Sequence, residues 1–353
     1  MTRIDPTPVP RAVAAAPMRG AAAWPRRLVR TLAAEYTVLV VTVAYFAAAS
    51  LFVPELTAPR NLSNLLTNML PLLAVAIGQT VVLITGGIDL SVTSIIAAAS
   101  VAAGWAMTSA GAAAGQHLPN PAGIWPAVAL ALAVGAGVGL LNGAAITALR
   151  MPPFVVTLST MMALGGAALW VTKSRNFGNL PEAFTALGYG DIGGVPAALV
   201  VVAALALLAH ILLTHTLPGR WLYATGHNPT ASLISGVPVR RVTAAAYVVS
   251  GACAAVAALI YTARLESGSP TMGREILLDV IGATVIGGTS LFGGRGKVPW
   301  TVLGVFLFEL INNTLNLYGL EYYTIMSVKG AVILAAAGID LARARLLARS
   351  AAP

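Results

Sequence analysis

Long apolar runs separated by short polar connections make up most of this 353-residue chain. A helix rises 1.5 Å per residue and needs about 20 mainly apolar residues to cross a bilayer. The pattern therefore predicts an all-α, polytopic integral membrane protein of ten transmembrane helices, with eight as the lower bound. The predicted spans are residues 33–53, 70–85, 91–109, 124–149, 153–172, 195–213, 242–262, 276–292, 298–317 and 324–341.

The second and third spans are separated only by GGIDLS (residues 86–91), which holds two glycines, one carboxylate and one hydroxyl. Lipid tolerates such a break only where protein or a water-filled cavity satisfies the freed backbone groups. A break between hydrophobic helices is therefore typical of a translocation path. We assign to this path the residues Gly86, Gly87, Asp89, Ser91, Asn142 and Asn312.

The same polar residues also have structural interpretations, which the sequence leaves open. The two glycines of the break are suited to end one helix, and Asp89 or Ser91 is suited to cap the next. Amides on apolar helices, such as Asn142 and Asn312, form hydrogen bonds between helices. Glycines that recur at every fourth residue in 135–143 predict close packing of one helix against another.

The composition excludes a soluble protein, because 58% of the residues are hydrophobic and only 9% are charged, against about 25% charged in ordinary globular domains. The single cysteine, Cys253, has no partner for a disulfide and is expected to be a packing residue. The net charge of +9 does not indicate nucleic-acid binding, because the basic residues flank the apolar runs. With the N-terminus inside, fifteen Lys and Arg fall on the inner face and five on the outer. This bias predicts cytoplasmic N- and C-termini.

Three regions follow from this pattern. Residues 1–33 are predicted to form a disordered, basic cytoplasmic tail, residues 34–342 the transmembrane domain and residues 343–353 a second basic cytoplasmic tail. The longest inner connection is segment 214–241.

Segment 214–241 contains the signals of a short helix in its middle. Asn228 is a good N-cap, Pro229 suits the first helical position and Gly236 supplies a left-handed stop. A helix of about seven residues is marginal alone in water and needs something to pack against. We expect it to dock on a cytoplasmic partner; the alternative is packing on its own membrane domain.

Glu309 and Lys329 are charges of opposite sign within predicted spans. An unpaired charge is costly in lipid. We expect the two side chains to pair or to face a shared aqueous cavity, and a proton relay is the rival interpretation.

No catalytic or cofactor-binding motif is recognisable. The stretch GGRGK (293–297) is not a phosphate-binding loop, because Leu291 occupies the position of the first glycine and Val298 follows the lysine. The histidines lack metal-ligand spacing and no nucleophile elbow is present. We therefore expect no enzyme activity, no metal and no cofactor in this chain, and any ATP would act on another polypeptide.

Four segments together resemble a known family, the permease subunits of carbohydrate ABC importers of the ribose, xylose and galactoside type. These segments are ITGGIDLSVTSI (84–95), MPPFVVTLSTM (151–161), GHNPTASLISGVPVRR (226–241) and LLDVIGATVIGGTSLFGGRG (277–296). The resemblance covers nearly the whole chain beyond about residue 35.

The resemblance implies a permease subunit in a bacterial inner membrane that translocates a monosaccharide. It implies as partners a second permease copy or paralogue, cytoplasmic ATPase subunits that hold the ATP, and a periplasmic sugar-binding protein. It also implies that the loop at 226–241 seats in a groove of the ATPase. Threonine stands where the Glu-Ala-Ala-x-x-x-Gly loop of importer permeases usually has glutamate. The residues assigned to this coupling role are Asn228, Thr230, Ala231, Ser232, Gly236 and Arg240.

Two other classes of membrane protein remain as alternatives. An ion-coupled secondary transporter of a polar metabolite needs an intramembrane acidic cluster, whereas Asp89, Asp279 and Glu309 are widely separated along this chain. A membrane-embedded enzyme needs a convergent set of acid, base or metal-ligating groups, and the sequence offers none.

Overall fold

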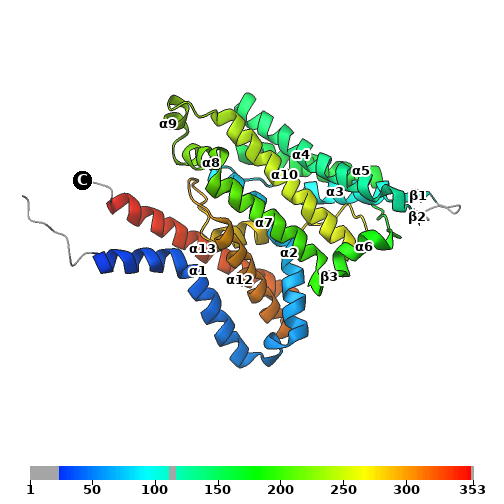
Figure 1. The fold of residues 1–353 in the computed structure, drawn as a ribbon, viewed down its shortest axis with the longest axis horizontal. Helices are drawn as coiled ribbons and strands as arrows, with labels where there is room; N and C mark the ends of the chain where they lie inside the picture. The colour runs from blue at the N-terminus through cyan, green and yellow to red at the C-terminus, as the bar shows by residue number, and fades with distance from the viewer. Residues whose placement is uncertain (1–23, 111–116, 351–353) are drawn as a thin grey trace, which may run out of the picture.

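The computed structural model describes residues 24–110 and 117–350, and it has the predicted all-α architecture (Figure 1). The helices are α1 (Trp24–Phe52), α2 (Pro59–Ile84), α3 (Val92–Ala106), α4 (Ile124–Ala148), α5 (Pro153–Thr172), α6 (Glu182–Tyr189), α7 (Ala197–His215), α8 (Leu217–His227), α9 (Pro229–Ile234), α10 (Val239–Arg264), α11 (Ile276–Ile286), α12 (Val298–Leu317) and α13 (Tyr322–Ser350). Two antiparallel two-stranded sheets pair β1 (Thr108–Ala110) with β2 (His117–Pro119), and β3 (Asp191–Ile192) with β4 (Val195–Pro196). Short 3₁₀ helices occupy Pro54–Thr57 and Pro121–Gly123.

Each predicted span coincides in position with one helix, namely α1–α5, α7 and α10–α13. Within the described residues, seven helices are long and apolar enough to cross a membrane. Three further apolar stretches are shorter: Tyr36–Phe52, which is the second part of α1, and the helices Val92–Ala106 and Ile276–Ile286. The chain is therefore a polytopic membrane protein, and ten full crossings stays a prediction.

The N-terminal tail is shorter than predicted, because α1 begins at Trp24. Residues 24–33 are helical rather than disordered, and residues 1–23 lie outside the described part of the chain. The reason is local: this stretch is rich in Arg, Leu and Ala, which favour helix, and Pro25 falls in the first turn, where proline is tolerated. At the other end, α13 extends to Ser350, well into the predicted tail 343–353.

Segment 214–241 folds as two helices, α8 and α9, of which only α9 was predicted. The N-terminus of α8 is capped by Thr216, whose hydroxyl accepts a hydrogen bond from the Gly219 amide at 3.2 Å. The connection is therefore more ordered than its proline and glycine content indicates.

The central element is α2, in which every residue from Met69 to Ile84 is buried. It packs against α7, α10, α11 and α12. Figure 1 shows α3, α4, α5 and α10 gathered on one side of the molecule and α1, α12 and α13 on the other. The buried part of α2 is apolar except for Gln79 and Thr80, and its position in the middle leaves the outer helices to face lipid.

The glycines of α4 confirm the predicted close packing of helices. A Cβ atom on Gly135 would lie 2.2 Å from the carbonyl oxygen of Gly251 on α10, and one on Gly139 would lie 2.2 Å from that of Tyr247. Helix backbones can come this close only where no side chain stands between them. The pair α4–α10 is therefore a tight seam.

Candidate functional site

The polar break after α2 is a sharp turn built on its first glycine. Thr85 ends the helix, and Gly86 adopts a φ of 82°, the left-handed conformation that glycine tolerates. Gly87 then packs closely against the next element, because a Cβ atom there would lie 2.4 Å from the Tyr247 hydroxyl. The prediction that these glycines end the second span is confirmed.

Asp89 is fully buried, and its carboxylate is hydrogen-bonded by Ser91 in the break and by Ser250 on α10. Its Oδ1 atom accepts hydrogen bonds from the Ser91 backbone N–H at 3.0 Å and the Ser91 hydroxyl at 2.6 Å. Its Oδ2 atom accepts one from the Ser250 hydroxyl on α10 at 2.8 Å. A buried carboxylate is tolerated when it is hydrogen-bonded in this way.

The hydrogen bonds continue from the break into two more helices. The Ser91 hydroxyl accepts from the amide nitrogen of Asn142 on α4 at 2.9 Å. The amide oxygen of Asn142 in turn accepts from the hydroxyl of Thr160 on α5 at 2.7 Å. This chain, which we call the Asp89 network (Ser250, Asp89, Ser91, Asn142, Thr160), ties the break to three helices.

The Asp89 network corrects the capping interpretation, because α3 begins without a side-chain cap from either Asp89 or Ser91. It supports the interpretation of Asn142 as an amide that hydrogen-bonds between helices. Asp89, Ser91 and Asn142 are all buried and line neither of the two cavities described below. Their assignment to a translocation path stays a prediction.

A polar cavity of about 370 Å³ opens at the end of the bundle where α10 terminates. It is lined by Asn68 and Leu72 of α2, Tyr189 of α6, Tyr261, Arg264 and Leu265 from α10 and its end, Ile276 and Asp279 of α11, and Glu309 and Asn312 of α12. Five of these side chains are amides or charged groups. Of the residues predicted for the path, Asn312 lies here.

The ion pair in this region differs from the predicted one. The ammonium group of Lys329 lies 2.9 Å from Oδ2 of Asp279, not against Glu309. The physical reason is that α13 packs chiefly along α11, which places the carboxylate of α11 nearest the lysine. Asp279 and Glu309, although distant in sequence, line the same cavity. The expectation of separated acidic residues was wrong for this pair.

The walls of the polar cavity are fixed by Arg264. Its guanidinium donates to the Thr67 carbonyl oxygen at 2.8 Å and to Oδ1 of Asn68 at 2.6 Å. The Tyr189 hydroxyl donates to the carbonyl oxygen of the same arginine. The end of α10 is thereby joined to α2 and α6, an arrangement that no sequence motif indicated.

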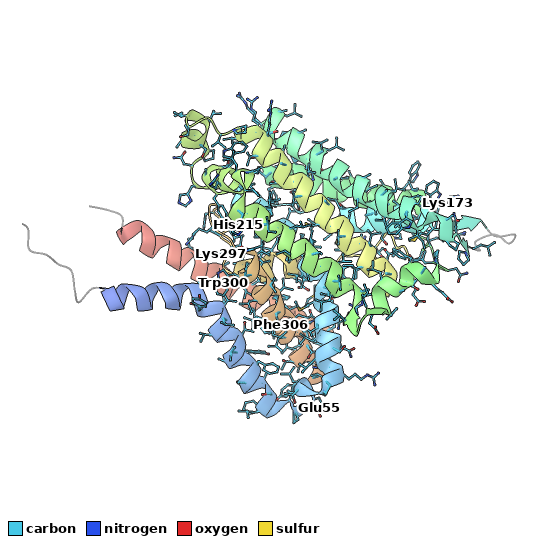
Figure 2. All side chains as sticks on the ribbon, viewed as in Figure 1. Glu55, Lys173, His215, Lys297, Trp300 and Phe306 are labelled. Atoms are coloured by element: carbon cyan, nitrogen blue, oxygen red, sulfur yellow. The ribbon has the colours of Figure 1, made fainter. Side chains whose placement is uncertain are left out.

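A second cavity, of about 580 Å³, lies between α1, α11, α12 and α13, and Tyr223 of α8 and the loop before α12 complete its wall. Its lining is mostly apolar, with Lys297 and Trp300 at the start of α12, both labelled in Figure 2. The Trp300 ring meets that of Tyr36 edge to face, with 5.3 Å between centroids. An apolar cavity of this kind suits lipid or apolar side chains, so the polar cavity is the candidate site for a hydrophilic solute.

Helix α9 has the local structure that the sequence predicts. Oδ1 of Asn228 accepts a hydrogen bond from the Ala231 amide at 2.9 Å, and Gly236 adopts a φ of 82°. Ser232 is buried, whereas Thr230, Ala231 and Arg240 are exposed. The helix therefore presents most of its surface outward.

Segment 214–241 also contacts both glycine-rich breaks of the membrane domain, at what we call the glycine junction (Gly226, Ile84, Gly86, Gly293, Gly294). A Cβ atom on Gly226 would lie 1.8 Å from the Ile84 carbonyl oxygen and 2.6 Å from the Gly294 amide nitrogen. The Gly294 N–H donates to that Ile84 oxygen at 2.8 Å. A Cβ atom on Gly293 would lie 2.9 Å from the Gly226 oxygen and 3.0 Å from the Gly86 nitrogen. Three chain segments thus meet backbone to backbone.

Tyr223, one turn before Gly226, adds a side-chain contact to the junction. Its hydroxyl donates to the Gly296 carbonyl oxygen at 2.7 Å, and burial raises the pKa of this hydroxyl. Sequence reasoning missed both Tyr223 and Gly226, although Gly226 opens one of the four segments quoted above. A glycine placed at the end of a helix was the available signal.

Comparison with known proteins gives consistent matches over most of the chain. The family model described as "Branched-chain amino acid transport system / permease component" matches residues 61–337. The ribose import permease protein of Escherichia coli is 35% identical over 306 residues, which are 86% of this chain and 92% of that protein. The ribose import permease protein of Bacillus subtilis is 37% identical over 295 residues, 82% of this chain and 88% of that protein.

A third relative is the L-arabinose transport system permease protein of Escherichia coli, which is 33% identical over 306 residues, 87% of this chain and 90% of that protein. No solved structure matches the chain.

Proposed function

Because the chain belongs to the permease family of branched-chain amino acid transport systems, we propose that it is the transmembrane permease subunit of an ATP-driven importer of a monosaccharide. The observation that carries this proposal is the identity of 33–37% to permeases named for ribose and L-arabinose, over 82–87% of the chain. The name of the family mentions amino acids, but these relatives are named for sugars.

In this proposal the chain works as one part of an assembly in a bacterial inner membrane. A separate cytoplasmic ATPase holds and hydrolyses ATP, so this chain is no enzyme and binds no cofactor itself. A periplasmic binding protein delivers the sugar, and a second permease, identical or paralogous, completes the membrane unit. The absence of a phosphate-binding loop in the sequence supports the assignment of ATP to another chain.

The geometry that favours an ATPase partner is the surface of α9. Leu233 and Ile234 are 64% and 82% exposed on a segment that connects helices rather than crossing the bilayer. Exposed apolar side chains on such a segment mark an interaction site. With Thr230, Ala231 and Arg240 also exposed, α9 provides a protruding surface on which an ATPase subunit can dock.

The proposed mechanism passes from α9 to the membrane domain through the glycine junction. Closure of the ATPase subunits on ATP would move α8 and α9 together. Because Gly226 touches Ile84 and Gly294 directly, this movement would reach the ends of α2 and of the loop before α12. Because the backbones are in close contact, a small displacement of α8 moves its neighbours and is not taken up by side-chain rearrangement.

The test is purification from native membranes with the ATPase, followed by uptake assays in proteoliposomes. We expect an ATPase subunit to co-purify and to drive uptake of ribose or L-arabinose in the presence of the binding protein. Gly236→Pro should release the ATPase, because proline cannot adopt the φ of 82° and removes the N–H that bonds the Leu233 oxygen at 3.1 Å.

Gly194→Pro is a closely matched control. Gly194 has a φ of 84°, has open space around it and donates its N–H to Asp191 Oδ1, three residues earlier, at 3.2 Å, but it lies in the β3–β4 turn. The control should retain the ATPase. A chain that purifies without an ATPase, and that transports solute with an ion gradient as its energy source and no ATP, would overturn the proposal.

A further inference from the structure

The polar cavity combines groups that suit an uncharged, hydroxyl-rich molecule. Its lining offers carboxylates as acceptors, amides as both donors and acceptors, and one guanidinium as a donor. A hydroxyl group both donates and accepts, so a solute with several hydroxyls can use all three kinds of partner. Tyr189 and Tyr261 add aromatic surface for the apolar face of a ring. The volume of about 370 Å³ falls within the range typical of small-molecule sites.

The charges of the cavity argue against an ionic ligand. Asp279 and Glu309 are offset by Arg264 in the lining and by Lys329, which is bonded to Asp279. Neither an anion nor a cation therefore meets an excess of opposite charge. Beside the aliphatic Leu72, Leu265 and Ile276, polar groups from four helices converge here, which suits a solute with several hydroxyl groups better than the side chain of a branched-chain amino acid. The chemistry favours a neutral polyhydroxyl solute.

A buried amide lies deeper on the same side of α2. At 3.6 residues per turn, Asn68, Leu72 and Gln79 fall on one face of this helix, and Gln79 lies about 10 Å below Leu72. Gln79 is fully buried, and within the described residues neither Nε2 nor Oε1 of its side chain has a hydrogen-bond partner. A buried amide without partners is costly and calls for an explanation.

We propose that the polar cavity is a binding site for the hydroxyl groups of a neutral sugar on its way through this subunit, and that Gln79 is the next group to meet it. This inference rests on the proposed function and deepens it. The cavity and α9 lie at opposite ends of α10, whose 26 residues span about 39 Å. The site therefore lies far from the proposed ATPase surface, at the end of the subunit where a solute would enter.

The first test compares uptake with stability in two variants of nearly unchanged volume. Gln79→Leu removes an amide that has no partner, so its thermal midpoint should stay level or rise. Asn312→Leu removes one hydrogen-bonding group from the cavity. In proteoliposomes with the ATPase and the binding protein, both variants should lose at least about tenfold in sugar uptake, while ATPase binding and basal hydrolysis persist.

Two controls separate this role from a structural one. Thr80→Val removes a hydroxyl that is satisfied by the Ala76 oxygen and Thr301, each at 2.8 Å, so it should lower the thermal midpoint and keep uptake. Asn64→Leu makes the same change as Asn312→Leu at an exposed position of α2 outside the lining, and it should keep uptake. Uptake within about twofold of wild type in both Gln79→Leu and Asn312→Leu would overturn the inference.

A second test detects occupancy directly by thiol labelling. The single cysteine is buried, so Cys253→Ala gives a background without reactive thiols. Asn312→Cys in that background should react with a methanethiosulfonate reagent, and ribose or L-arabinose delivered by the binding protein should slow the reaction. Tyr318→Cys, exposed at the end of α12, should react equally with and without sugar. Protection by leucine instead of sugar would overturn the inference.

Failure of the proposed function gives a different result. In that case wild-type protein itself shows no ATP-driven sugar uptake, whereas failure of the cavity alone leaves wild-type uptake intact and the variants unaffected.

Discussion

The most informative single substitution is Gly226→Ala, because it adds one methyl group where three backbone segments touch. The new Cβ would lie 1.8 Å from the Ile84 oxygen, and since an ordinary carbon–oxygen contact is about 3.3 Å, the two backbones must separate by roughly 1.5 Å. The neighbour is backbone, so no side-chain rotation relieves the contact. Overpacking of this kind costs about 1–3 kcal/mol, and loss of the bond from the Gly294 N–H to Ile84 costs about 1 kcal/mol more.

The proposed transport cycle alternates between two conformations of the permease. A cost of about 3 kcal/mol that falls on only one of them shifts their population ratio by roughly a hundredfold. We expect Gly226→Ala to keep the ATPase bound, because α9 is unchanged, and we expect the bound ATPase to keep hydrolysing ATP. Sugar transported per ATP hydrolysed should fall at least about tenfold. The assay is simultaneous measurement of phosphate release and of labelled sugar uptake in proteoliposomes.

The control for this substitution is Gly166→Ala, since an added Cβ at Gly166 meets nothing within 4 Å. Its transport and thermal midpoint should match wild type. Transport per ATP within about twofold of wild type in Gly226→Ala would refute the idea that the glycine junction carries the coupling. Complete dissociation of the ATPase would refute it as well, because it would mean that the junction only supports α9.

Three further predictions concern stability, each measured as the thermal midpoint of purified protein. Asp89→Asn should destabilise by about 1.5–3 kcal/mol, because the amide places a donor against Ser91 or Ser250 in the Asp89 network; an unchanged midpoint would show that the network is dispensable. Lys329→Met should destabilise by roughly 2–3 kcal/mol, somewhat below the value for fully buried pairs, and exchange of Lys329 with Asp279 should restore part of it, whereas exchange with Glu309 should not. Gly139→Leu should destabilise by about 1–3 kcal/mol or more through contact with α10; Gly137→Leu on the open face of the same helix should not, and equal effects would contradict the tight seam.

The features that the sequence predicts correctly are those decided by a few neighbouring residues. Asn228 and Gly236 delimit α9 because capping and a left-handed stop depend only on local backbone. Gly86 ends α2 for the same reason. The ten apolar runs coincide with helices because hydrophobicity along the chain fixes where helices form.

The features that sequence reasoning missed depend on which helices become neighbours. Lys329 pairs with Asp279 rather than Glu309 because α13 lies along α11, and no local signal carries that adjacency. The polar cavity joins Asn68 to Asn312 across most of the chain for the same reason. Helix α8 was missed differently: its cap, Thr216, was present in the sequence, but the proline and glycine that follow resemble a loop.

The seam between α4 and α10 has a consequence for measuring motion in this protein. With carbonyl oxygens where side chains would otherwise stand, the two helices have no room to slide, and the Asp89 network fastens α5 and the break to them. This block is a fixed frame of reference. Spectroscopic labels on α4 and α10 should report a constant distance through the transport cycle, and labels on α4 and α13 should report whatever displacement ATP produces.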